Sequence, residues 1–128
     1  MTEILDASAL LALLQAEPGS ERVAQALPRA AMSVANLAEV AAKQVDIGLD
    51  ASELVGRTEA LGIRTHEVTR EDVATQARIR QRDRDGRLGL SLGDRLCLAL
   101  ALRLDLPVIT ADRAWEDLDL PIEVILIR

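Results

Sequence analysis

Short apolar runs alternate along the chain with longer stretches in which apolar residues recur three and four positions apart. The runs are rich in branched aliphatic residues and favour strands, whereas the longer spacing is typical of helices that bury one face. Glycine and proline residues mark many of the junctions. Short strands are predicted at 3–6, 31–33, 63–66, 108–110 and 123–127, and helices at 8–15, 20–27, 34–47, 50–61, 69–83, 91–104 and 113–117.

Strands that alternate with helices predict a parallel sheet, because two parallel neighbours need a crossover connection and a helix supplies it. The expected fold class is α/β, with three layers (α/β/α) around a central, mostly parallel sheet of about five short strands. A chain of 128 residues has the usual length of one domain and can bury a core of its own. Since no repeat or linker-like tract interrupts it, we expect residues 1–128 to form a single domain.

The hydrophobic residues make up 49% of the chain, which excludes disorder as its main state. Tyr and Phe are absent and Trp115 is the only aromatic residue, so the core must be packed with aliphatic side chains. Modules that bind single strands by stacking bases rely on several aromatic side chains. The composition therefore argues against a stacking type of nucleic-acid-binding module.

Acidic residues occur in four separate segments of this predicted fold. Asp6 and Asp112 each close a strand-like run, and Glu39 and Asp94 belong to helical stretches between them. Because open α/β sheets bind ligands beyond the carboxyl ends of their strands, we expect the four side chains to converge there. Gathered carboxylates repel one another, and a hard divalent cation with oxygen ligands relieves that repulsion. The sequence therefore predicts a site for Mg²⁺ or Mn²⁺.

Each of these acids also has a purely structural interpretation. Asp6 and Asp112 stand where a side chain can cap the next helix. Residues 91–94 have the capping-box form, in which the acid at the fourth position bonds back to the cap amide. Glu39 precedes Lys43 by four residues, the favourable order for a helical ion pair. What favours a functional site is that all four acids can meet.

The charge balance bears on what the chain binds. A formal net charge of −6 argues against nucleic acid, although two bound divalent cations would bring it to about −2. Arginines gather in one short segment, as Arg78, Arg80, Arg82, Arg84 and Arg87. They form either a solvated helix end or a strip that contacts phosphates, which guanidinium groups bind bidentately. The functional interpretation predicts RNA contacts for Arg80, Arg82, Arg84 and Arg87.

Cys97 is the only cysteine, so no internal disulfide can form and a reducing compartment is indicated. It lies in the apolar run 96–102, which is too short to span a bilayer. The first residues lack a basic region followed by an apolar core, which argues against a signal peptide. We therefore expect a cytoplasmic location without membrane association.

Four motifs of this chain resemble those of PIN domains. They are residues 4–10 (ILDASAL), 33–40 (SVANLAEV), 90–101 (LSLGDRLCLALA) and 108–115 (VITADRAW). Each motif is short, but the set is specific, occurs in the family's order and covers essentially the whole chain. Within the family, so compact a chain resembles the VapC-type toxins of bacterial type II toxin–antitoxin pairs.

The resemblance implies a metal-dependent endoribonuclease. Asp6 and Asp94 would be the principal ligands of Mg²⁺ or Mn²⁺, and Glu39 and Asp112 would complete the catalytic cluster. The neighbouring hydroxyls of Ser8 and Thr110 would hold the acids in place; helix-start or turn hydroxyls are the structural alternative. The partners implied are an RNA substrate, a cognate antitoxin protein and a second copy of the chain in a homodimer.

Two alternatives stay within the same fold. One is a housekeeping PIN nuclease that processes RNA, and the other is a non-catalytic PIN module that binds RNA or a partner protein. The presence of all four acids favours a nuclease. Cleavage of a generic RNA with and without a chelator separates a nuclease from a binding module, and the neighbouring gene separates a toxin from a housekeeping enzyme.

Overall fold

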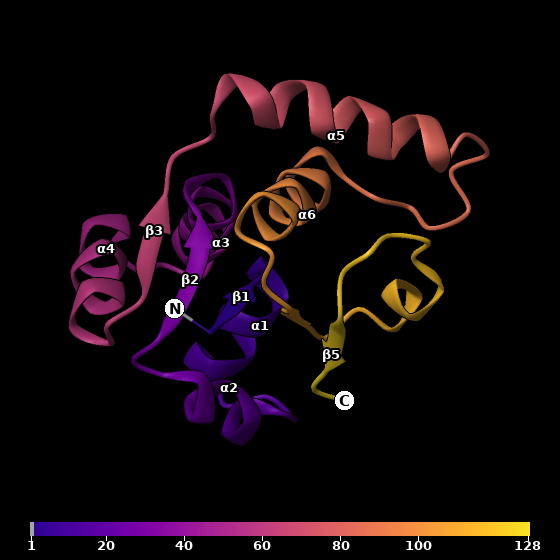
Figure 1. The fold of residues 1–128 in the computed structure, drawn as a ribbon. Coiled ribbons are helices and arrows are strands. Elements are labelled where there is room, and N and C mark those ends of the chain that lie inside the picture. The colour runs from indigo at the N-terminus through magenta and orange to yellow at the C-terminus, as the bar shows by residue number, and fades with distance from the viewer. Residues whose placement is uncertain (1) are drawn as a thin grey trace.

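The central sheet is built from five strands of three or four residues, and every neighbouring pair is parallel. The computed structural model describes residues 2–128. The strands are β1 (Glu3–Leu5), β2 (Ala30–Ser33), β3 (Arg64–His66), β4 (Val108–Thr110) and β5 (Val124–Leu126), in the spatial order β3-β2-β1-β4-β5 (Figure 1). The predicted α/β class is therefore confirmed, and the sheet is wholly parallel within the described residues.

Helices follow the strands where the sequence predicts them. They are α1 (Ala7–Leu14), α2 (Ser20–Ala26), α3 (Val34–Asp46), α4 (Ala51–Ala60), α5 (Arg70–Arg82) and α6 (Leu92–Leu104). The last predicted helical segment is a 3₁₀ turn, η1 (Arg113–Asp117). Differences from the predicted bounds are one or two residues and fall at element ends, where capping decides the last helical residue.

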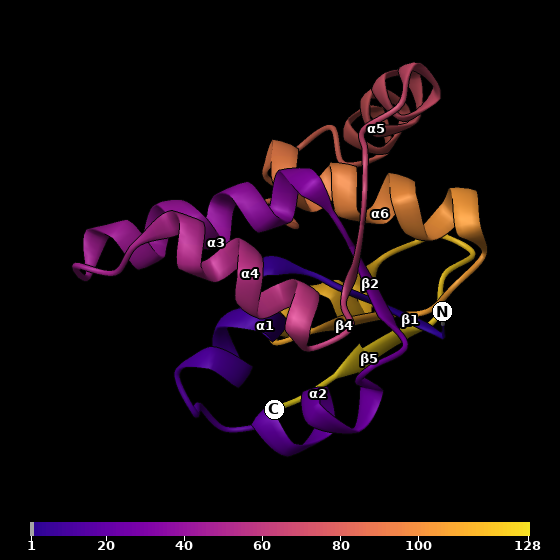
Figure 2. The same cartoon turned by 90° about the vertical axis from the view of Figure 1, so that its left-hand side faces the viewer.

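Alternate residues of the strands enter two separate cores, one on each face of the sheet. Ile4 belongs to one core and the next residue, Leu5, to the other, because successive side chains of a strand point to opposite faces. Helices α1 and α2 cover the Leu5 face, whereas α6 covers the Ile4 face with α5 packed outside it (Figures 1 and 2). These are the three layers expected from the sequence.

Both cores are aliphatic apart from one buried aromatic residue. Trp115 of η1 is fully buried with Ile4, Val108 and the α6 residue Leu98. The thiol of Cys97 is free and buried in the same core. A partly buried ion pair between Arg103 and Asp72 joins α6 to α5, with 3.0 Å between Nε and Oδ1. None of the helices in residues 2–128 has the length and apolar character needed to cross a membrane.

The order of the strands brings distant parts of the chain to one edge. β1 is the middle strand and lies between β2 and β4, with Ile4 aligned to Ala31 on one side and to Val108 on the other. The residues that follow these three strands therefore leave the sheet side by side. Helix α3, which continues directly from β2, contacts α1 and α6 at this edge.

Candidate functional site

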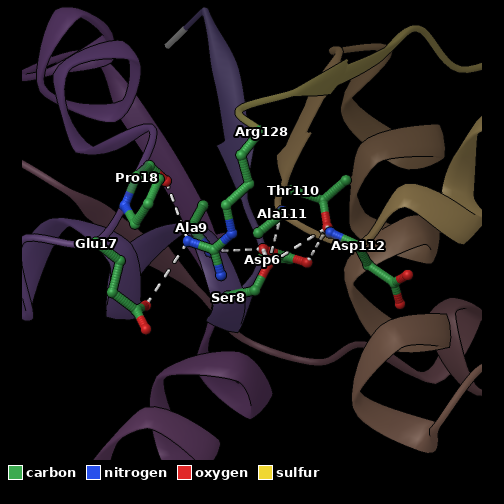
Figure 3. Close-up of polar contacts among 9 residues, drawn as sticks. All are labelled: Asp6, Ser8, Ala9, Glu17, Pro18, Thr110, Ala111, Asp112 and Arg128. Atoms are coloured by element: carbon green, nitrogen blue, oxygen red, sulfur yellow. Dashed lines mark hydrogen bonds and ion pairs between the residues drawn. The ribbon is translucent and has the colours of Figure 1, made fainter.

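Asp6 lies at the centre of this edge, directly after β1, and is only 3% exposed. It caps α1, since its Oδ1 accepts hydrogen bonds from the Ala9 amide (2.8 Å) and the Ser8 hydroxyl (2.7 Å). Its Oδ2 accepts a hydrogen bond of 2.5 Å from the Thr110 hydroxyl at the end of β4 (Figure 3). The capping interpretation of Asp6 is confirmed, and the carboxylate is fixed from two strands at once.

The hydroxyls of Ser8 and Thr110 join Asp6 to the turn that carries Asp112. Each hydroxyl gives its single proton to Asp6, and each also accepts a backbone amide. The Ala111 amide donates to Ser8 Oγ (2.9 Å) and the Asp112 amide to Thr110 Oγ1 (3.0 Å). The two hydroxyl oxygens, 3.4 Å apart, have no proton left for each other. Both hydroxyls therefore hold the Asp6 carboxylate in one orientation and tie it to the turn after β4.

Asp94 approaches Asp6 from the first turn of α6. Its Oδ2 accepts from the Ser91 amide (2.9 Å) and its own amide donates to Ser91 Oγ (3.0 Å), which is the predicted capping box. Burial raises the pKa of Asp94 above its usual value, and the nearby Asp112 carboxylate adds to the rise. Burial likewise raises the pKa of Asp6 to about 6, opposed by its hydrogen bonds and reinforced by Asp94. The acids are thus close enough to repel one another.

Asp112 lies at the exposed end of the group. It follows β4 and caps η1, because its Oδ1 accepts from the Ala114 amide at 3.0 Å. The four acids thus range from buried Asp6, through half-buried Glu39 and Asp94, to exposed Asp112. A ligand arriving from solvent would meet Asp112 first and Asp6 last.

Glu39 reaches the site from α3 and lies against α6. A Cβ atom added to Gly93 would be 2.2 Å from Oε1 of Glu39, so the missing side chain makes room for this carboxylate. The Asn36 amide nitrogen donates to Glu39 Oε1 (2.9 Å) and to the Gly93 carbonyl (3.0 Å). The structural alternative for Glu39, an ion pair with Lys43, does not form within residues 2–128. The hydrogen bond from Asn36 instead holds the carboxylate in the space that Gly93 leaves on α6.

Three of the acids also affect the buried thiol of Cys97. Burial raises its pKa well above the usual range, and the carboxylates of Asp6, Asp94 and Glu39 raise it further. As they stand, however, no three acidic, histidine or cysteine side chains within residues 2–128 form a group that could hold a metal ion. Most of the carboxylates are turned toward their own helix starts, which satisfies hydrogen bonds while keeping like charges apart.

The donor chemistry nevertheless fits a hard divalent cation. All four candidate ligands are carboxylates, which suit Mg²⁺ and Mn²⁺. The raised pKa of Asp6 shows a buried carboxylate without a compensating positive charge, and a cation beside it would favour its charged form. In addition, Oδ1 of Asn36 is buried and has no hydrogen-bond partner within residues 2–128. The site can therefore offer only oxygen ligands to an ion.

The structure divides the predicted arginine strip into two groups. Arg80 and Arg84 line a hollow beside the start of α6, together with Arg95. Arg82 and Arg87 line a different hollow among the acids of η1 and the turn after it. The four arginines therefore do not line one common hollow. Arg80 and Arg82 are two residues apart on α5 and point in different directions, and Arg84 and Arg87 follow the end of the helix.

Sequence reasoning missed three residues of this region: Asn36, Gly93 and Arg95. A glycine within a helix costs up to about 1 kcal/mol relative to alanine, so Gly93 in an otherwise Leu- and Ala-rich segment was a usable signal. Asn36 is a polar residue on the buried face of α3, three positions before Glu39. Arg95 is a charged residue on the buried side of α6. Each interrupts an apolar pattern at a place where the fold needs a polar contact.

Comparisons with known proteins agree with this arrangement. The sequence profile of the PIN domain matches residues 4–120. Similar solved structures include a toxin–antitoxin complex from Klebsiella pneumoniae, with 17% identity, coverage of 95% of this chain and 99% of that chain, and a TM-score of 0.74. The DNA-bound VapBC from Salmonella typhimurium has 15% identity, 100% and 99% coverage, and a TM-score of 0.75.

A third similar structure is a Sarcin-Ricin loop cleaving toxin, VapC20 from Mycobacterium tuberculosis. It has 14% identity, coverage of 86% of this chain and 88% of that chain, and a TM-score of 0.68. No curated protein sequence matches the chain. At these identities the solved structures establish a shared fold.

Proposed function

The chain belongs to the PIN domain family, and on that premise we propose that it is a metal-dependent endoribonuclease of the VapC type, the toxin of a toxin–antitoxin pair. The observation that carries the proposed activity is the meeting of acids from separate segments. The Thr110 hydroxyl joins Asp6 to the turn of Asp112, and Glu39 lies against Gly93, the residue before Asp94. The toxin–antitoxin complexes and the RNA-cleaving toxin among the similar structures support the biological role and the substrate.

The four acids would have different roles in the site, according to how deeply each is buried. Asp6 and Asp94 would be the principal ligands, and Glu39 and Asp112 would complete the cluster. Bound Mg²⁺ or Mn²⁺ would supply an activated water and neutralise charge on the scissile phosphate. Ser8 and Thr110 hold Asp6 in one orientation, and Asn36 does the same for Glu39. Glu39 and the exposed Asp112 would also orient the attacking water.

Cleavage of a generic single-stranded RNA by the purified chain tests this proposal directly. We expect cleavage with Mg²⁺ or Mn²⁺ and none after EDTA is added, because hard cations bind oxygen ligands that cannot act alone. A folded protein that binds RNA but never cuts it would instead be a non-catalytic PIN module. Cleavage that EDTA leaves unchanged would contradict the metal dependence.

Gly93→Ala is predicted to separate activity from stability. Alanine is the better helix former, so the free energy of unfolding should stay level or rise by up to about 1 kcal/mol. The new Cβ would lie 2.2 Å from Glu39 Oε1 and displace the end of this flexible side chain. We expect RNA cleavage to fall roughly 10-fold to 100-fold, the range for losing the positioning of a ligand.

The matched control for Gly93→Ala is Gly56→Ala on α4. An added Cβ at Gly56 has no atom within 4 Å, so only the helix-propensity gain remains. Thermal unfolding and initial cleavage rates of both variants give the comparison. Equal activity of the two variants would show that the position of Glu39 does not matter for cleavage.

We also propose that residues 1–128 act as one domain, that the chain forms a homodimer and that it acts in the bacterial cytoplasm. Exposed large apolar residues, Val45, Ile47 and Leu49, lie at the end of α3 and in the turn after it, and exposed apolar groups mark contact surfaces. We expect sedimentation equilibrium to give twice the 13.9 kDa chain mass. Ile47→Asp should yield monomers, whereas Val73→Asp on α5 should not. A monomeric parent would contradict the dimer.

A further inference from the structure

A hollow of about 410 Å³ lies between the end of α5, the segment that leads to α6 and the first turns of α6. Three guanidinium groups line it, those of Arg80, Arg84 and Arg95, and we call it the arginine hollow. Arg80, in the last turn of α5, and Arg84, in the turn that follows the helix, are both exposed and line the same hollow. Within residues 2–128 neither of them forms an ion pair.

The arginine hollow is unbalanced in charge, in contrast to its neighbour. Its lining has three arginines against one acid, Asp83, whose Oδ1 already accepts the Leu88 amide at 3.2 Å. In the neighbouring hollow of about 240 Å³, two arginines face four aspartates. One of these arginines, Arg82, donates from Nη1 to the Asp119 carbonyl at 2.6 Å. Of these two hollows, the arginine hollow is the one with an excess of positive charge.

Arg95 forms a fixed wall of the arginine hollow. The residue is 8% exposed, and its Nε donates to Gln76 Oε1 (2.9 Å) while its Nη1 donates to the Leu90 carbonyl (2.8 Å). Nη2 is thus the guanidinium nitrogen that has no hydrogen bond within residues 2–128. A buried guanidinium held by two partners keeps its orientation and can bind an anion without losing side-chain entropy on binding.

The arginine hollow adjoins the acidic site through Arg95. This residue follows Asp94 on α6, and its guanidinium charge partly offsets the rise in the pKa of Asp94. An RNA strand whose scissile phosphate lies at the acids would bring another phosphate to the arginines. An acidic segment of a partner protein would fit less well, since its continuation would meet the repulsive carboxylates of Asp6, Asp94 and Asp112. The volume lies within the roughly 300–1,000 Å³ of typical ligand sites, which leaves room for a nucleotide.

We propose that the arginine hollow binds a backbone phosphate of the RNA strand, at a nucleotide beside the one that is cut. This inference rests on the proposed ribonuclease function and names where its substrate is held. The hollow has no aromatic lining residue for stacking, and guanidinium groups on a phosphate do not distinguish bases. Recognition at the arginine hollow is therefore independent of base sequence.

The test measures how the full chain binds single-stranded RNA in EDTA, over a series of salt concentrations. We expect Arg80→Gln with Arg84→Gln to raise the Kd roughly tenfold at low salt, on two RNAs of different sequence alike. The slope of log K against log salt should fall by about 0.7, the value for one lost phosphate contact on a single strand. In Mg²⁺ the same variant should raise KM more than it lowers kcat.

The matched control is Arg82→Gln with Arg87→Gln, which makes the same change in net charge at the neighbouring hollow. It should leave the Kd and the salt slope near those of the parent. Equal effects of the two double variants would show that only net charge matters. If neither double variant changed RNA binding, the arginine hollow would not be an RNA site. Loss of a co-purified partner protein by the Arg80 and Arg84 variant, with RNA binding unchanged, would assign the hollow to that partner.

The outcomes for the inference and for the proposed function are distinguishable. A parent that binds RNA through Arg80 and Arg84 but does not cut it would refute the nuclease function and retain the phosphate site. A parent that cuts RNA, with KM and salt slope unaffected by the double variant, would refute the phosphate site and retain the nuclease. A parent that neither binds nor cuts RNA would refute both.

Discussion

Asp94→Asn is expected to reduce RNA cleavage by more than about 100-fold, because it removes a charge that is needed to hold a hard cation, and such a cation contributes several kcal/mol of charge stabilisation. The fold should survive. Asparagine has nearly the same size, and its Oδ1 can still accept the Ser91 amide that now bonds to Asp94 Oδ2. We expect the free energy of unfolding to change by no more than about 1 kcal/mol.

Asp72→Asn is the matched control, because Asp72 occupies the same position in the capping box that begins α5. It lies apart from the acidic site and also pairs with Arg103, so its replacement should cost more stability than Asp94→Asn. Cleavage should nevertheless remain near the parent rate. The measurements are the cleavage rates and thermal midpoints of the parent and the two variants. Cleavage by Asp94→Asn at the parent rate would show that Asp94 only caps the helix.

Thermal unfolding with and without Mg²⁺ adds a readout that does not depend on activity. A ligand that binds only the folded chain raises its melting temperature by mass action. We expect Mg²⁺ to raise the melting temperature of the parent more than that of Asp94→Asn. The Asp72→Asn control should respond like the parent, and equal responses of all three proteins would place the ion elsewhere.

Expression of the chain alone is expected to arrest the growth of a bacterial host. An RNase whose carboxylates open to solvent at Asp112 would act on RNA throughout the cytoplasm, so cells need a dedicated inhibitor. The simplest inhibitor would place an Arg or Lys against the acids, where its charge replaces the cation and relieves their repulsion. Co-expression of the adjacent gene product should therefore restore growth, and the two proteins should purify as a complex.

Asp6→Ala is the control for this experiment. It should relieve the arrest while still binding the partner through the remaining surface, which separates toxicity from complex formation. Colony counts after induction and co-purification of the partner are the measurements. Normal growth of cells that contain the soluble, folded parent without a partner would favour the housekeeping nuclease or the non-catalytic module.

Local rules account for most of the elements that the sequence predicts. The β4 strand has the predicted bounds. A capping box begins α5 at Thr69 and Asp72, and another begins α6 at Ser91 and Asp94. These features depend on residues within one or two turns of one another, so the sequence shows them directly. For the same reason it predicted the capping role of Asp94. The 3₁₀ form of η1 was not predicted, because five residues of helical pattern suit either helix type.

Contacts between distant segments were beyond such rules. The pairing of Glu39 with Lys43 was the favourable local choice, yet Glu39 lies against Gly93, which is far along the chain and is brought close by the contact of α3 with α6. The arginines looked like one strip, and only the packing of the α5–α6 segment beside η1 sorted them into an acidic and a basic hollow.

The sequence by itself determined the order of strands and helices, the helix starts and the four acids, since these depend on short-range propensity and on residue type. Only the tertiary structure decided how deeply Asp6 is buried, which neighbours hold its carboxylate and which arginines share a hollow. Burial and charge balance depend on neighbours from all parts of the chain. Burial by these neighbours is the main reason that the pKa of Asp6 is raised to about 6. The candidate site residues can thus be identified from the sequence, whereas their pKa values depend on the fold.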